Sequence, residues 1–231
     1  MTLTVNGPES GPYRWTLTVT ERRSPTTFGD ELRVALADCD RGPVQLWIEA
    51  VDPDTEQQAT ELGFVAFRDL WQLRCPLPLP PTQQKPLITR AFTAEDADAF
   101  LAVNREAFAW HPEQGALSAD DLEQRSHEPW FNPEGFRLLH DGPDLIGFCW
   151  TKIHQHPPLG EIYAIAVHPS HHGQGLGLPL TRAGLDWLAD QGLTTGMLYV
   201  ESDNDAANAV YARLGFVHHQ TNRAYRYAPN D

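Results

Sequence analysis

A glycine-rich segment at residues 167–177 (VHPSHHGQGLG) has the residue types and spacing of a phosphate-binding loop. It follows an apolar run that is typical of a buried strand, and it precedes an amphipathic run that predicts a helix. Glycines let a backbone bend tightly and approach a ligand, and the first N–H groups of a helix lack partners within the helix. Such a unit can hold a pyrophosphate at the positive end of the helix dipole. A glycine-rich loop alone can also be a simple turn.

A carboxylate, Glu161, begins the strand that leads into this loop. Strict strand alternation would place Glu161, Tyr163, Ile165 and Val167 on one face. A carboxylate there could act as a general base, directly or through water. The residue type alone favours an exposed glutamate at the start of a strand.

A phenol, Tyr211, lies in the last predicted helix, seven residues after Asn204 and three after Asn208. Helical spacing puts these three side chains on one face. A tyrosine there could donate a proton to a leaving group, although by residue type alone it is more often part of the core.

The chain of 231 residues carries 17 Lys and Arg against 31 Asp and Glu, a formal net charge of −14. This balance opposes nucleic-acid binding and polybasic membrane attachment, and it favours a small acceptor that bears an amine. We expect a cytoplasmic protein, because the sequence shows no signal peptide, no apolar run of about 20 residues and no CxxC pair. Cys149 is predicted to pack in the core.

Five prolines between residues 76 and 86 mark a boundary, because proline continues neither a helix nor a central strand. We therefore predict a short part at 1–75, a linker at 76–86 and a longer domain at 87–231. In the longer domain, helices are predicted at 94–108, 117–124 (with Ser118 as N-cap), 176–191 and 206–214, and strands at 136–140, 145–152, 161–167, 197–201 and 216–227. This alternation predicts an α/β layered fold.

The short part repeats the end of the long one on a smaller scale. A strand at 45–50, a helix at 54–62 and a strand to residue 73 follow the order of 197–227, and ELGF at 61–64 matches RLGF at 213–216. Two such matches suggest an internal duplication.

The loop at 172–177 resembles the Q/R-x-x-G-x-G/A pyrophosphate loop of the GNAT acetyltransferases, and the segment at 199–216 resembles a later strand and helix of that family. The resemblance implies the GNAT fold, a mixed central sheet with flanking helices, and acetyl-CoA as co-substrate without a metal. It implies Glu161 as base and Tyr211 as acid, with the pantetheine paired to the backbone of 165–167. The cofactor-binding positions that it implies are Ile165, Ala166, Val167, His172, Gly173, Gln174, Gly175, Leu176, Gly177, Leu178, Asn204, Asp205, Ala206, Ala207, Asn208 and Ala209.

More narrowly, several motifs between residues 87 and 227 resemble the mycothiol synthase family, namely HPEQG (111–115), EPWFNPEGF (128–136), GFCWTK (147–152), GEIYAIAV (160–167) and MLYVESDN (197–204). That family acetylates the cysteinyl amine of Cys-GlcN-inositol. The resemblance implies acceptor contacts from Glu113, Lys152, Glu161 and Tyr199. Simpler roles stay open: a cap or loop charge for Glu113, a solvated strand end for Lys152, and a core position for Tyr199.

Two departures from the family qualify this interpretation. His172 stands where the family has Gln or Arg, which puts one side-chain contact to the cofactor in doubt. The first 75 residues resemble only the end of a GNAT domain and lack a G-x-G loop, so we predict a truncated half domain without an acetyl-CoA site. We expect a monomer.

Three alternatives remain at this stage. The chain could acetylate another small amine or a peptide N-terminus, or it could be a non-catalytic acetyl-CoA-binding module. The histidines at 154, 156, 168, 171 and 172 could suggest a metal, but no HExxH or Cys-His spacing supports one.

Overall fold

The computed structural model describes residues 3–7, 12–20, 25–39, 42–83, 85–110 and 114–227. The chain divides into two compact units. Unit 1 comprises Met1–Gln72, Val200–Asn204 and His218–Asp231, and unit 2 comprises Leu73–Tyr199 and Asp205–Val217. The final strand, which the sequence analysis assigns to the catalytic domain, is thus counted almost entirely with unit 1.

Unit 1 holds five strands in the order β1-β2-β3-β10-β4. Strand β3 pairs in parallel with β2 and antiparallel with β10. The bounds are β1 (Leu3–Asn6), β2 (Trp15–Val19), α1 (Pro25–Asp38), β3 (Val44–Ile48), α2 (Pro53–Glu61), β4 (Val65–Pro76) and β10 (Val217–Tyr227). Alternate residues of β2 and β3 point inward and pack with side chains of both helices and of β10, including Leu17, Phe28, Leu46, Ala59 and Tyr225.

Arg223 of β10 joins three elements of unit 1. Its guanidinium donates two hydrogen bonds to the Asp69 carboxylate of β4, at 2.6 and 2.7 Å, and one to Glu56 of α2. The Arg223 side chain is 23% exposed, so this network is only partly screened by water. Paired charges with bidentate geometry stabilise a fold more than surface ion pairs do.

We expect Arg223→Ala to lower the free energy of unfolding by about 2 kcal/mol, because it leaves two carboxylates without their partner. Urea denaturation measures this change. Arg226→Ala, at an exposed position of the same strand, is the matched control and should change stability by less than about 0.5 kcal/mol. Equal effects of the two substitutions would contradict a stabilising role for the network.

Unit 2 holds the strands in the order β9-β8-β7-β6-β5. Strands β5 to β8 pair antiparallel, and β8 pairs in parallel with β9. The bounds are β5 (Thr89–Ala91), α3 (Ala97–Ala107), α4 (Ala119–Ser126), β6 (Phe136–Asp141), β7 (Asp144–Gln155), β8 (Pro158–Val167), α5 (Gly177–Asp190), β9 (Thr195–Glu201) and α6 (Asp205–Arg213). The predicted order of α-helices and strands is confirmed, whereas the three-residue β5 and the 3-10 turns Gln114–Ala116, Pro133–Gly135 and Pro169–His171 were not predicted. Ser118 caps α4 as predicted, accepting a hydrogen bond from the N–H of Asp121.

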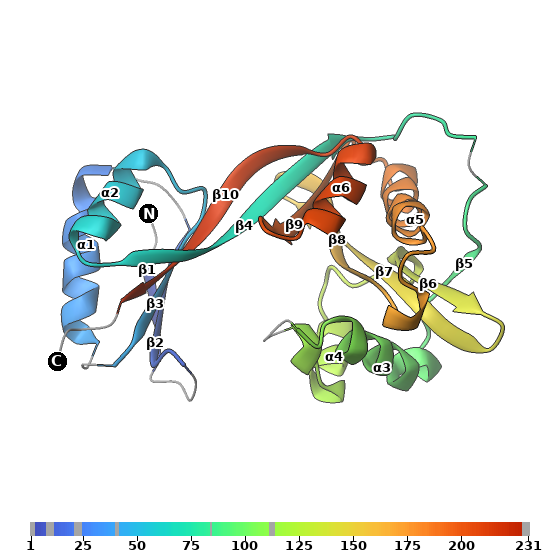
Figure 1. Cartoon of the computed structure of the whole chain (residues 1–231), viewed down its shortest axis with the longest axis horizontal. Coiled ribbons are helices and arrows are strands. Elements are labelled where there is room, and N and C mark those ends of the chain that lie inside the picture. Colours follow the sequence, from blue (N-terminus) through green and yellow to red (C-terminus); the bar gives the residue numbers. More distant parts are fainter. Residues whose placement is uncertain are drawn as a thin grey trace. The chain divides into compact units, whose positions relative to one another are not determined.

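The two faces of this sheet carry different helices: α5 and α6 lie on one side of β7 and β8, and α3 and α4 lie on the other (Figure 1). The α3/α4 face is an aromatic core that includes Phe100, Phe136, Phe148 and Trp150. On the α5 face Cys149 is fully buried, as predicted, and a Cβ on Gly184 of α5 would lie 2.5 Å from its sulfur.

The proline-rich segment packs against unit 2, to which it belongs. Leu77 and Leu79 are buried, and the N–H of Leu77 donates to the carbonyl of Thr194. Arg182 of α5 donates to the carbonyl of Pro80. Buried leucines at alternate positions therefore anchor the proline-rich segment to unit 2, and the chain bends at Leu77 and Pro78. No helix in the described part of the chain is long and apolar enough to cross a membrane.

The matching ELGF and RLGF segments form the same turn. Gly63 and Gly215 have φ of +90° and +86°, and each follows the end of a helix. The N–H of the next residue, Phe64 or Phe216, donates to a carbonyl five residues earlier, at 3.1 Å in both cases. Glycine is favoured at this position because only it adopts positive φ without strain. The internal duplication stays a prediction, to which this shared geometry adds support.

Candidate active site

The glycine-rich loop between β8 and α5 has an open, left-handed backbone. Gly173 and Gly175 have φ of +78° and +74°, and a Cβ at either position, or at Gly177, would meet no atom within 4 Å. No described side chain caps the start of α5. The first intrahelical bond runs from the N–H of Leu180 to Leu176, so the N–H groups of the preceding turn have no partner within the helix. This geometry fits a pyrophosphate held by backbone donors.

Gly175→Ala should weaken acetyl-CoA binding about tenfold, because alanine disfavours the positive φ that aims the loop's N–H groups. Isothermal titration calorimetry measures the affinity. Gly142→Ala is the matched control, since Gly142 also has positive φ and open surroundings but lies in the β6–β7 turn. Both substitutions should lower the free energy of unfolding by similar amounts, and only Gly175→Ala should weaken acetyl-CoA binding. Equal affinities of the two variants for acetyl-CoA would contradict a role for the loop.

His172, which departs from the family pattern, makes a contact within the loop. Its Nε2 lies 2.9 Å from the carbonyl oxygen of Val167, the last residue of β8. The ring thus ties the loop to the end of the strand. A contact from the His172 side chain to the cofactor stays a prediction.

Strand β8 has one backbone edge that is only partly paired. On the β7 side its ladder runs from Pro158 to Val167, whereas on the β9 side the ladder covers only Gly160 to Ile162 in the described structure. We call residues 163–167 the open edge of β8. An unpaired strand edge can pair with an extended ligand through main-chain hydrogen bonds. The open edge leads directly into the glycine-rich loop.

A β-bulge in β8 corrects the predicted alternation. The register shifts so that Trp150 pairs with Ala164 while Thr151 pairs with Ile162, which leaves Tyr163 as the extra residue. Tyr163 and Ala164 therefore both pack on the α3/α4 face. Ile165 lies opposite Cys149, which faces α5. The prediction that Glu161 and Tyr163 share a face with Ile165 and Val167 is wrong, because a bulge inverts the alternation beyond it.

Glu161 is buried, 7% exposed, on the α3/α4 face. It lies opposite Lys152 in the ladder, and its Oε2 lies 2.6 Å from Nε2 of His154. The Lys152 ammonium lies 4.6 Å from the centroid of the Trp130 ring and 5.5 Å from that of Tyr163. Lys152 is thus only half-exposed and packs on aromatic rings, unlike a solvated strand end. Its position beside Glu161 brings two predicted acceptor contacts together.

Tyr211 is buried on the inner face of α6. Asn208 of α6 and Asn204, which precedes the helix, are half-buried, whereas Asp205, Ala206 and Ala209 are exposed. The shared face of Asn204, Asn208 and Tyr211 stays a prediction. Burial raises the pKa of Tyr211 above its ordinary value, and the nearby Cys149 thiol raises it further. Tyr211 therefore lies on the α5/α6 side of the sheet and stays protonated at neutral pH.

The other predicted acceptor residues have separate outcomes. Tyr199 of β9 is 39% exposed, so a core position for it is excluded. Glu113 lies outside the described residues. The sequence indicates His154 only as a candidate metal ligand and does not predict its place beside Glu161. The signal that could have found it is a hairpin turn at 156–157, because strand alternation on both arms then puts His154 and Glu161 on the same face of the hairpin.

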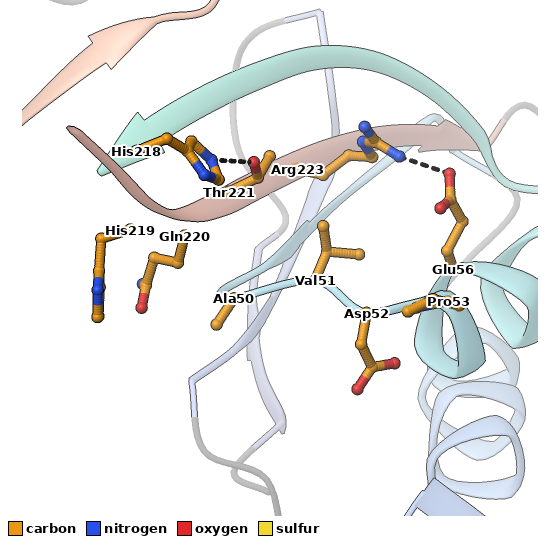
Figure 2. A pocket seen from close by; sticks show the side chains of 10 residues that line it. All are labelled: Ala50, Val51, Asp52, Pro53, Glu56, His218, His219, Gln220, Thr221 and Arg223. Carbon is orange, nitrogen blue, oxygen red and sulfur yellow. Dashed lines mark hydrogen bonds and ion pairs between the residues drawn. The ribbon is translucent and has the colours of Figure 1, made fainter. Parts of the chain in front are cut away.

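A separate cavity of about 580 Å³ lies within unit 1 (Figure 2). None of the predicted site residues lines it. Its polar groups bind one another: His218 lies 2.9 Å from the Thr221 hydroxyl, and Arg223 pairs with Glu56. Among the described residues, no group of three or more His, Cys, Asp or Glu side chains could hold a metal ion.

Comparison with known proteins now identifies the family. Residues 90–216, more than half of the chain, match the model of the acetyltransferase (GNAT) family. The chain belongs to the GNAT acetyltransferase family. Among solved structures, a GCN5-related N-acetyltransferase from Sphaerobacter thermophilus has a TM-score of 0.71 at 20% identity, covering 94% of this chain and 74% of that one. The predicted GNAT fold is thereby confirmed.

Two relatives of the chain within this family are named mycothiol acetyltransferase. A mycothiol acetyltransferase of Streptomyces scabiei is 47% identical over 188 residues, which cover 79% of this chain and 61% of that relative. A mycothiol acetyltransferase of Catenulispora acidiphila is 38% identical over 230 residues, covering 94% of this chain and 73% of the relative. These similarities confirm the narrower resemblance predicted from the motifs. The chain spans about three fifths of the length of the Streptomyces relative.

Proposed function

We propose that this GNAT protein transfers acetyl from acetyl-CoA to the cysteinyl amine of Cys-GlcN-inositol, which yields mycothiol and CoA. The similarity to mycothiol acetyltransferases over 79% of the chain carries this proposal. The pairing of Lys152 with Glu161 supports it, because both belong to motifs resembling that family and they lie directly opposite each other. A carboxylate and an ammonium suit an acceptor that is rich in hydroxyls and bears an amine.

Glu161 acts as the general base in this proposal. The acceptor amine is mostly an ammonium ion at neutral pH and must lose a proton before it can attack. Glu161 is a buried carboxylate on the α3/α4 face, so the acceptor binds on that face. The Trp130 and Tyr163 rings beside Lys152 provide flat apolar surface against which a sugar ring can pack.

Acetyl-CoA supplies an activated acetyl thioester. The loop at 172–177 holds its pyrophosphate, and the open edge of β8 pairs with its pantetheine. One N–H of this edge polarises the thioester carbonyl, as an oxyanion-hole donor does. Tyr211 approaches from the opposite face of the sheet and protonates the departing thiolate. In this proposal the amine approaches from the α3/α4 side of β8, and the departing thiolate is protonated from the α5/α6 side.

A screen of amine acceptors with acetyl-CoA tests the proposal, with thiol release and product mass as readouts. The panel contains Cys-GlcN-inositol, glucosamine, cysteine and a peptide with a free N-terminus. We expect acetylation of Cys-GlcN-inositol with the highest kcat/KM. Acetylation of another panel member but not of Cys-GlcN-inositol would favour a different amine acceptor. Acetyl-CoA binding without turnover of any acceptor would favour a binding module.

A further inference from the structure

His154 lies beside the proposed base and is absent from the mechanism given above. Its Nε2 lies 2.6 Å from Oε2 of Glu161, diagonally across the β7–β8 hairpin. We propose that His154 is a positioning residue, which donates its Nε2–H to Oε2 of Glu161 and so leaves Oε1 to take the proton of the acceptor ammonium. This inference rests on the proposed function, since it assigns a role beside the base of that reaction.

The surroundings of Glu161 explain why a single N–H donor, that of His154, can orient its carboxylate. A carboxylate has two oxygens, and a buried carboxylate needs a partner to stay charged. Among the described residues, His154 is the hydrogen-bond partner of Glu161. The Lys152 ammonium, although opposite in the ladder, packs on the Trp130 and Tyr163 rings. His154 therefore fixes the rotation of the carboxyl group and the oxygen that faces the acceptor.

The charged groups around this pair come from both strands and from the end of α4. Lys152 lies on β7, and Arg125, Glu128 and Glu161 all act electrostatically on Tyr163. Burial raises the pKa of Tyr163, so its hydroxyl adds no charge near neutral pH. The His154 side chain is 32% exposed, whereas that of Glu161 is 9% exposed. The imidazole thus connects a buried carboxylate to the solvent side of the hairpin.

Two substitutions of His154 in the full chain separate positioning from packing. Glutamine keeps an N–H donor and alanine removes it. We expect His154→Ala to lower kcat about tenfold or more while the KM for acetyl-CoA changes less than about twofold. His154→Gln should restore most of the rate.

His218→Ala, at an exposed position in unit 1, is the control and should leave both kcat and the KM for acetyl-CoA unchanged. A His154→Ala variant with wild-type kcat would overturn the inference. His154→Gln activity as low as that of His154→Ala would also overturn it, because the donor would then not be the feature that matters.

A second readout does not depend on the acceptor. Nitrogen-15 NMR of the labelled full chain reports which ring nitrogen of each histidine carries a proton, and the signal missing from His154→Gln assigns His154. We expect a protonated Nε2 at neutral pH, and an unprotonated Nε2 would overturn the inference. If the wild-type chain acetylates no amine, the proposed function fails, while this spectrum still decides how the pair is arranged.

Discussion

Tyr211→Phe is expected to lower kcat by about 10²-fold or more, because it removes the proposed acid for the departing thiolate and little else. The ring stays in the core, where it packs edge-on against Phe216. The KM for acetyl-CoA should change little, since the hydroxyl acts mainly in the transition state. Steady-state kinetics with CoA release as readout measures both constants.

The neighbouring thiol shows why an acid is needed at this place. Burial raises the pKa of Cys149 to about 12, and Tyr211 lies close enough to interact with it electrostatically. A CoA thiolate expelled into the same surroundings would be strongly basic and a poor leaving group. Tyr211 keeps its proton at neutral pH because burial raises its pKa too. Its ionisation should therefore produce no alkaline limb in kcat between about pH 7 and 9.

Tyr227→Phe provides the control for this substitution. Tyr227 is half-buried in unit 1, where it packs against Phe64. The Tyr227→Phe variant should have the wild-type kcat, since Tyr227 lies outside the proposed site. Wild-type kcat in Tyr211→Phe would exclude the acid role.

Glu161→Gln is expected to lower kcat/KM for the acceptor by about 10³-fold at neutral pH. The amide keeps the size of the side chain but cannot accept a proton from the ammonium. The loss should become smaller as pH rises toward the pKa of the acceptor amine, because more of the amine is then already neutral. Acetyl-CoA affinity, measured by calorimetry, should stay within about twofold of wild type.

Glu61→Gln, at an exposed position of α2 in unit 1, removes the same charge outside unit 2. This control variant should leave kcat/KM unchanged. The comparison separates the effect of losing one negative charge from the effect of losing the proposed base, Glu161. If Glu161→Gln and Tyr211→Phe both retained full turnover, the proposed mechanism would be excluded.

The sequence predicts most elements of unit 2 because each carries a local pattern. Ser118 caps α4 by its own side chain, and α6 places the half-buried Asn208 three residues before the buried Tyr211, as helical spacing predicts. The loop at 172–177 is predictable for a similar reason, since glycine at positive φ is a local requirement. Local chemistry was sufficient in each case.

The features that the sequence did not predict are set by pairing between distant segments. Nothing in GEIYAIAV marks Tyr163 as the bulged residue, because the bulge depends on the register with β7. The place of His154 depends on the same hairpin. The pairing of β10 with β3 joins residues about 180 positions apart, and apolar alternation alone names no partner strand.

A crystal structure of the full chain with coenzyme A tests the central claim most directly, namely that one acetyl-CoA site lies in unit 2. We predict a single bound molecule, with its pyrophosphate on the backbone N–H groups of 173–178 and its pantetheine along the open edge of β8. The sulfur should lie within hydrogen-bonding reach of the Tyr211 hydroxyl. A coenzyme bound in unit 1, or one bound away from the glycine-rich loop, would contradict the account.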